Sequence, residues 1–208
     1  MTAALGFAPH SGWAAVVAVA GDAGHPTVVY RGRIEMADST RRDSRQPYHA
    51  VESLPLVEAE RRLADFSASA LRLAVGSVSK IADELRAKNS PIEAAGILDS
   101  SGRKGGNLEA ILASHALIHT ADGDHFREAL EAACQRSDLR VVRVRKSDLL
   151  TRALAVLGTS SSKLEEAVRA MGKPFGPPWG ADQKSAALLA WLLLADPISS
   201  TTAARRES

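Results

Sequence analysis

Apolar and polar positions along the chain predict five β-strands. Short apolar runs account for the first two strands, and turn residues separate them at Ala8–Gly12. The third strand alternates, with Tyr30, Ile34 and Met36 on one face. The fourth is apolar almost throughout, as a central parallel strand should be. The predicted strands are residues 3–7, 13–20, 27–36, 92–99 and 139–145.

Apolar residues that recur with a helical period predict the rest of the fold. A long helix begins at Pro55, a residue favoured in a first turn, and runs to Leu85. The polar, arginine-rich segment before it, residues 37–55, is predicted to be a loop. Further helices are predicted over residues 108–119, 124–136, 148–157, 162–171 and 181–195.

The order of these elements predicts an α/β fold. An antiparallel meander followed by right-handed β–α–β crossovers gives a mixed five-stranded sheet covered by helices. We expect one domain over residues 1–196 and a disordered tail over residues 197–208. The long helix carries an apolar seam at alternating spacings of three and four, which predicts packing on its own sheet or a homodimer contact. The residues proposed for that contact are Leu56, Leu63, Phe66 and Leu73.

The amino-acid composition adds few constraints on the function of the chain. The chain has 208 residues, of which 45% are hydrophobic and 24% charged, as in an ordinary globular domain. A net charge of +2 and a pI near 8.8 permit a local nucleic-acid-binding patch without arguing for one. Cys134 is the only cysteine, so a disulfide within the chain is excluded and a reducing, cytoplasmic compartment is expected. The longest apolar run, Ala186–Ala195, is too short to span a membrane, which needs about 20 residues.

Four segments carry a resemblance to a known family. The element order is that of the ribonuclease-H-like fold, and the details resemble its RuvC branch, the Holliday-junction resolvases and their relatives. The matching segments are the opening strands LGFAPHSGWAAVVAV, the fourth strand AAGILDSS, the fifth strand with its next helix LRVVRVRKSDLLTRALAVLG, and the last helix GADQKSAALLAWLLL. The resemblance covers most of the chain, from Ala3 to Asp196, and implies a nuclease fold.

The resemblance implies a catalytic centre that this chain carries only in part. The family hydrolyses a phosphodiester with two divalent cations held by about four carboxylates. Those positions fall on Ala8 in the first strand, Asp99 after the fourth, and Asp182 and Ser185 in the last helix. Two divalent cations about 4 Å apart repel by roughly 17 kcal/mol at an effective dielectric of about 20, so two carboxylates are too few to hold the pair. One Mg²⁺ or Mn²⁺ ion on Asp99 and Asp182, with His10 as a third ligand or general base, remains compatible with the sequence.

Each of these residues also has an ordinary structural interpretation. Asp99 stands where an Asx turn would end the fourth strand, and Asp182 lies in a first helical turn, where the dipole favours acids. His10 follows a proline in a predicted turn, where a histidine often bonds the backbone. The joint placement of Asp99 and Asp182 at family positions favours a functional role for both residues. It predicts that the side chains of Asp99 and Asp182 lie close together with Ala8 beside them.

The segment SHALIHTADGDH raises a separate metal hypothesis. His115 and His119 are four residues apart on a predicted helix, as in paired-ligand sites, with Asp122, Asp124 and His125 just beyond. No glutamate follows the first histidine, as the zinc-protease motif requires, and the loop lacks the ligand spacing of a calcium site. Histidines near a helix C-terminus are also favoured as caps, so the sequence favours the structural interpretation.

A basic rim would provide contacts to branched or duplex nucleic acid. Its candidate residues lie in or beside loops: Arg41, Arg42, Arg45, Arg103, Lys104, Arg143, Arg145 and Lys146, with Trp179 as a base-stacking candidate. Three functions stay open. The chain is a RuvC-like nucleic-acid-binding protein with an eroded nuclease centre and a structural or regulatory role, an active nuclease with an altered one-metal site, or a dimeric protein-interaction module that keeps only the fold.

Overall fold

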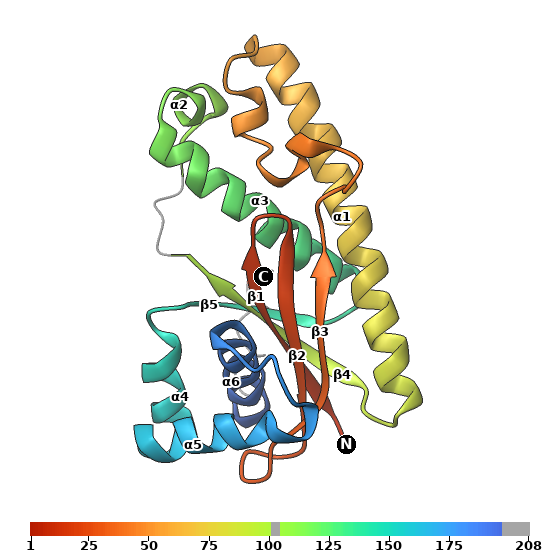
Figure 1. Cartoon of the computed structure of the whole chain (residues 1–208), viewed down its shortest axis with the longest axis vertical. Coiled ribbons are helices and arrows are strands. Elements are labelled where there is room, and N and C mark those ends of the chain that lie inside the picture. Colours follow the sequence, from red (N-terminus) through yellow and green to blue (C-terminus); the bar gives the residue numbers. More distant parts are fainter. Residues whose placement is uncertain (101–104, 197–208) are drawn as a thin grey trace, which may run out of the picture.

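A five-stranded mixed sheet forms the centre of the molecule (Figure 1). The computed structural model describes residues 1–100 and 105–196, so the predicted tail at residues 197–208 lies outside the described part. The strands are β1 (Ala3–His10), β2 (Trp13–Ala20), β3 (Thr27–Glu35), β4 (Ile92–Asp99) and β5 (Arg140–Arg145). Their order is β3-β2-β1-β4-β5; β2 is antiparallel to β1 and β3, whereas β1, β4 and β5 are parallel. The predicted meander followed by parallel strands is thereby confirmed.

Helices cover both faces of this sheet, as Figure 1 shows. One face carries α1 (Leu56–Ala87) and α3 (His115–Arg136), and the other carries α4 (Leu149–Leu157), α5 (Ser161–Met171) and α6 (Ala181–Ala195). The short helix α2 (Leu108–Leu112) packs against α3 and α1. Short 3-10 helices lie at Arg42–Arg45, His49–Val51 and Lys173–Phe175. Within the described ranges, no helix is both long enough and apolar enough to cross a membrane.

The helices after β4 differ from the prediction. The sequence predicted two helices over residues 108–119 and 124–136, but α2 ends at Leu112 and α3 runs unbroken from His115. Residues 120–123, between the two predicted helices, are helical, because Gly123 destabilises a helix by only about 1 kcal/mol and burial of its neighbours on α3 outweighs that. His115 and His119 therefore lie in the first turns of a helix, and the interpretation of them as C-terminal caps is wrong.

β1 extends further than predicted. Residues 8–10, which the sequence placed in a turn, continue the strand, and only Ser11–Gly12 form the turn. Gly12 has a φ of +84°, a left-handed conformation that glycine adopts without strain. Pro9 fits because β1 pairs with β4 only as far as Phe7, so the N–H that proline lacks has no partner strand to meet there.

Side chains of β1 alternate between two apolar layers. Ala4 and Ala8 pack on the side of α6, whereas Leu5 and Phe7 pack on the side of α1 and α3. Cys134 lies in the second layer, and burial raises the pKa of its thiol to about 12, as in an inert core cysteine. The alternation directs Ala8 toward α6, the helix that carries Asp182 and Ser185.

Much of the apolar seam of α1 is buried within its own chain. Leu63 and Phe66 are buried in a small cluster with Val51, under the segment that precedes the helix. Leu56 is 42% exposed, and Leu73 is partly exposed. The side chains of Leu63 and Phe66 are therefore not accessible to a second copy of the chain, contrary to the interpretation of the seam as a dimer contact. A homodimer stays a prediction that rests on Leu56 and Leu73.

Gly6 sets the separation between β1 and α6. A β-carbon at this position would lie 1.9 Å from the carbonyl oxygen of Ala186, a backbone atom that cannot move without the helix. Asp182 lies about one turn before Ala186 on α6. The close approach therefore also brings Asp182 to the end of β1.

Gly6→Ala should destabilise the fold by about 3 kcal/mol, near the upper end for overpacking, because α6 must move off the sheet. The melting temperature should fall by about 6–12 °C in a thermal unfolding experiment. Gly76→Ala on α1 is the matched control, since nothing lies within 4 Å of its added carbon. This control should stabilise the chain by about 0.5–1 kcal/mol. Unchanged stability of Gly6→Ala would contradict the close approach of α6.

Candidate functional site

One pocket of about 260 Å³ lies where the carboxyl ends of β1 and β4 meet the first turn of α6. Five residues singled out from the sequence line it: Ala8, His10, Asp99, Asp182 and Lys146. The lining is completed by Pro9, Leu98, Ser100 and Arg127. The two acids therefore lie at one end of the sheet with Ala8 beside them, as the family positions predicted.

His10 is held between Asp182 and Trp13. Its Nε2 atom lies 2.9 Å from Asp182 Oδ2. Its ring stacks on the indole of Trp13, with centroids 4.3 Å apart and planes 10° from parallel. The guanidinium of Arg33 lies over the same indole, 3.9 Å from the ring centroid. The histidine is thus oriented by stacking, and it engages a carboxylate oxygen that could otherwise bind a metal.

Asp99 is engaged by its own backbone and by α3. Its Oδ1 atom accepts a hydrogen bond from the backbone N–H of Ser100 at 2.9 Å, and it lies 3.8 Å from Arg127 Nε. The same guanidinium pairs with Asp124 at 3.4 Å and donates to the carbonyl oxygen of Leu98 at 3.2 Å. Arg127 therefore fixes α3 to the end of β4 and places a permanent positive charge at the pocket.

Sequence reasoning missed Arg127. It lies in the predicted helix 124–136, and its local sequence HFREAL differs little from an ordinary amphipathic helix. Its role arises from the packing of α3 against the end of β4, which the sequence pattern does not specify. The signal that could have helped is the spacing from Asp124, since residues three apart on a helix share a face.

The charges in the pocket do not fit a pair of divalent cations. Asp99 and Asp182 contribute two negative charges, and Arg127 and Lys146 contribute two positive charges, so the pocket is balanced without a metal. Ala8 offers no oxygen at the first family position. A metal pair would add four positive charges about 4 Å apart, whose repulsion needs several carboxylates to offset it. The donor set therefore differs from the two-metal centre implied by the resemblance.

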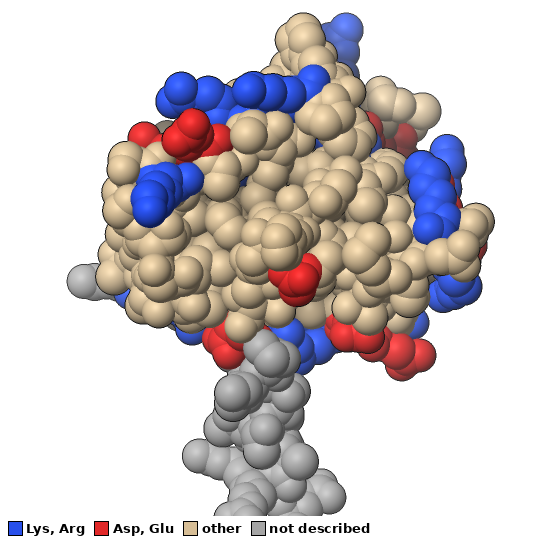
Figure 2. Space-filling view, turned by 90° about the horizontal axis from the view of Figure 1, so that it is seen from below, with Lys and Arg blue, Asp and Glu red and all other residues tan. Residues whose placement is uncertain are grey.

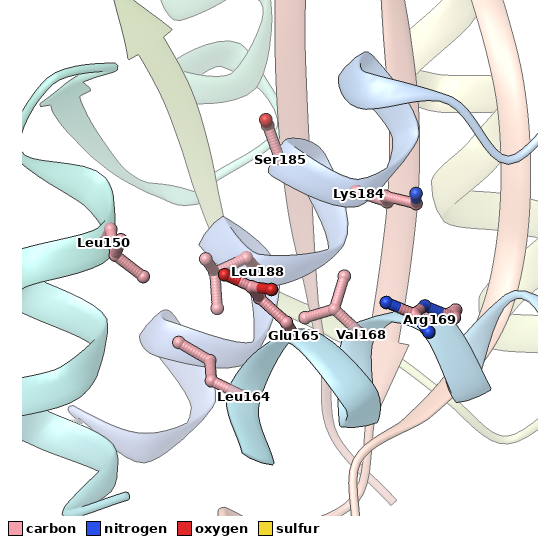
Figure 3. A pocket seen from close by; sticks show the side chains of 8 residues that line it. All are labelled: Leu150, Leu164, Glu165, Val168, Arg169, Lys184, Ser185 and Leu188. Carbon is pink, nitrogen blue, oxygen red and sulfur yellow. The ribbon is translucent and has the colours of Figure 1, made fainter. Parts of the chain in front are cut away.

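Ser185, at the remaining family position, lines a different pocket. Figure 3 shows this pocket, of about 290 Å³, between α4, α5 and α6. Its lining residues are Leu150, Leu164, Glu165, Val168, Arg169, Lys184, Ser185 and Leu188. The hydroxyl of Ser185 points away from the side chains of Leu164 and Leu188 (Figure 3). A serine brings no negative charge, so it does not replace the missing carboxylate.

Four of the candidate basic residues are exposed. Arg145 and Lys146 lie at the carboxyl end of β5, where Arg145 is level with Asp99 in the register of β4 and β5. Arg42 and Arg45 lie in the first 3-10 helix. Of these four, Lys146 lines the pocket and Arg145 precedes it in the chain, so these two are accessible to phosphate groups at the pocket.

Other candidate basic residues are occupied within the chain or lie outside its described part. Arg41 stacks on the ring of Phe66 at 4.1 Å, and Arg143 pairs with Glu131 on α3 at 3.4 Å. Arg103 and Lys104 fall outside the described residues. The basic rim, where the structure describes it, is therefore smaller than the sequence suggested.

Trp179 makes its contacts within the chain. Its Nε1–H donates to the carbonyl oxygen of Val168 at 2.9 Å. Its ring lies so close to Gly172 that a β-carbon there would be 2.2 Å from it. The half-buried ring thus helps to hold the loop before α6 against α5.

Among the residues that the structure describes, one end of the molecule shows no continuous basic surface. Figure 2 shows that end from below, where Lys and Arg side chains lie along the margins and most of the surface is uncharged. A surface that binds phosphate groups needs several positively charged side chains close together. The exposed cations beside the pocket are therefore better placed for it.

Comparisons with known proteins identify the fold. No family model matches the chain, and no curated protein matches its sequence. Among solved structures it is similar to Thermus thermophilus RuvC, with a TM-score of 0.51 and 8% identity over 94% of this chain and 95% of that chain. It is also similar to T. thermophilus RuvC in complex with a Holliday junction substrate, with a TM-score of 0.51 and 11% identity over 92% of each chain. The chain therefore has the ribonuclease-H-like fold of RuvC, as the resemblance predicted.

Proposed function

We propose that the chain is a nucleic-acid-binding protein of RuvC-like fold whose pocket does not act as a two-metal nuclease, and that its role is structural or regulatory. One observation carries this proposal. The pocket keeps two acids at family positions, but Arg127 and His10 engage them, and Ala8 stands where the first acid would be. Such a pocket lacks the negative charge that the two metals of a phosphodiesterase centre need.

The nucleic-acid part of the proposal rests on the cations beside the pocket. Lys146 lines the pocket, and Arg145 is exposed next to it. Cations in such positions attract phosphates and release counterions when they bind them. The RuvC structure to which this chain is similar includes a Holliday junction substrate, which makes a four-way junction the first ligand to test.

We expect salt-dependent binding to four-way junctions and duplex DNA, and Arg145→Gln with Lys146→Gln should weaken it. If each side chain neutralises one phosphate, the slope of log K against log salt should become shallower by about 1.8. The affinity should then fall by about 10–100-fold near 0.1 M salt. Fluorescence anisotropy titrations at several salt concentrations measure both quantities.

Arg86→Gln with Lys88→Gln is the matched control for this double variant. It removes the same charge at the C-terminal end of α1, where the two side chains pair with Asp83 and Glu84. Its salt slope should equal that of the unmodified chain. If micromolar protein binds no nucleic acid near 0.1 M salt, the proposal is wrong and the protein-interaction module remains.

A second candidate is an active nuclease with an altered site. The observation that favours it is that Asp99, Asp182 and His10 line one pocket, so a single Mg²⁺ or Mn²⁺ ion would have two carboxylates and an imidazole near it. Hydrolysis assays separate the two candidates, because only the altered nuclease would lose turnover on Asp99→Asn.

A further inference from the structure

Three histidines meet at the end of the molecule away from α5. His49 comes from the 3-10 helix His49–Val51, and His115 and His119 come from the first turns of α3. One nitrogen from each residue can be chosen so that all three lie within 4.8 Å of one another. The Nε2 atoms of His115 and His119 are 3.0 Å apart, and the ring of His49 lies edge-on to both. In Figure 1 this cluster belongs to the lobe formed by α2 and the starts of α1 and α3.

The local structure explains why these side chains converge. Residues four apart on a helix share a face, which aligns His115 with His119. The segment before α1 folds back onto α3, where the backbone N–H of Tyr48 donates to Asp122 Oδ1 at 2.7 Å. That hydrogen bond places the next residue, His49, beside His115 and His119.

Asp122 orients the third histidine. His49 Nδ1 lies 2.5 Å from Asp122 Oδ2, and the carboxylate side chain is only 4% exposed. Burial raises the pKa of Asp122, and the hydrogen bonds from His49 and Tyr48 oppose that rise. A carboxylate that accepts from Nδ1 leaves Nε2 as the free ligand atom of the ring. Metal-binding histidines are usually held in this way by an outer carboxylate.

We propose that His49, His115 and His119 form a three-nitrogen site for a borderline divalent transition metal such as Zn²⁺, with Asp122 as the outer carboxylate. Imidazole nitrogen suits Zn²⁺, Co²⁺, Ni²⁺ and Cu²⁺, whereas Mg²⁺ and Ca²⁺ prefer oxygen. His115 and His119 are exposed, so an ion can enter and a water can take the remaining position.

The proposed site is separate from the pocket at β1 and β4. His119 and Arg127 are eight residues apart on α3, about 12 Å along its axis. The metal would join the segment before α1 to α3, because its ligands come from both. That segment follows Arg42 and Arg45, so the ion would also help to hold the loop that carries two of the exposed cations.

Zinc titration of the full chain tests the site. The protein is freed of any affinity tag, stripped with a chelator, and titrated with ZnCl₂ by calorimetry and with Co²⁺ by visible absorption. We expect one equivalent to bind, and the melting temperature to rise by about 5–10 °C at a hundredfold excess over Kd. Mg²⁺ should neither bind there nor compete.

Four variants make this test specific. His115→Gln and His119→Gln change exposed side chains, so they should fold normally and lose at least a hundredfold in zinc affinity together with the Co²⁺ absorption. Asp122→Asn should lose about 10–100-fold. His25→Gln is the matched control, because His25 is an exposed histidine in the β2–β3 turn, and it should bind like the unmodified chain. Absence of a saturable single site, or full affinity in His115→Gln and His119→Gln, would overturn the proposal.

Discussion

With Mg²⁺, the unmodified chain should leave four-way junctions, duplexes and single strands intact. Ala8 supplies no ligand, and the two remaining acids are engaged by Arg127 and His10. Mg²⁺ gives up its waters reluctantly and demands near-octahedral oxygen ligands, so this donor set should hold it poorly. Loss of the metals removes several kcal/mol of transition-state stabilisation, or about a thousandfold or more in rate. Gel assays on DNA and RNA substrates with Mg²⁺ and with Mn²⁺ measure the outcome.

Restoring acids should restore metal binding at the pocket. Ala8→Asp returns the first family acid to the pocket, and Ser185→Asp adds a carboxylate three residues after Asp182 on α6. Arg127→Gln added to them removes the cation beside Asp99. Ala8 is only 4% exposed, so a carboxylate there is costly unless a cation compensates it. The restored variant should therefore be less stable than the unmodified chain without metal and should gain melting temperature with Mg²⁺.

An aspartate introduced elsewhere on β1 is the control for the stabilisation by Mg²⁺. Ala4 lies on the same face of β1 as Ala8 and is equally enclosed, but it is remote from Asp99 and Asp182. Ala4→Asp should be destabilised and should not respond to Mg²⁺. Robust Mg²⁺-dependent turnover by the unmodified chain, abolished in Asp99→Asn, would instead establish the altered nuclease.

The sequence predicts elements best where local signals agree with tertiary pairing. β2 and β4 have the predicted bounds because each is an apolar run that ends at turn-forming residues. The errors occur where pairing or packing overrides a local signal. Pro9 suggests the end of a strand but lies in β1 beyond the pairing with β4, and Gly123 falls between two predicted helices but lies inside α3.

For the candidate sites too, the sequence predicts residues with local signals and misses those whose contacts depend on tertiary packing. Asp99 and Asp182 could be placed from the sequence because the family resemblance assigns both to its acid positions, at the end of β4 and in the first turn of α6. Arg127 and His49 could not, because their contacts depend on how α3 packs. The hydrogen bond between His49 and Asp122 joins residues 73 apart in the sequence, with α1, β4 and α2 between them.

His125 should make the fold sensitive to acid. Its ring is 7% exposed on α3, and its Nε2 atom is buried with no hydrogen-bond partner among the described residues. Burial lowers the pKa of this histidine to about 4, and a hydrogen bond with the backbone of Phe66 opposes the shift only in part. The folded chain therefore keeps this ring neutral at pH values where an exposed histidine is charged.

Below about pH 6.5 the unfolded chain binds a proton at His125 that the folded chain does not bind, so the free energy of unfolding falls as the pH falls. The contribution is fully present above that pH and is lost by about pH 4, a change of about 3 kcal/mol. Urea unfolding at pH 7, 5.5 and 4 measures it, and the loss attributable to His125 is the difference from His125→Gln, whose amide does not titrate. His25→Gln should follow the unmodified chain. An equal loss of stability in His125→Gln would show that other groups cause the acid sensitivity, because removing the buried imidazole would then have changed nothing in the proton balance.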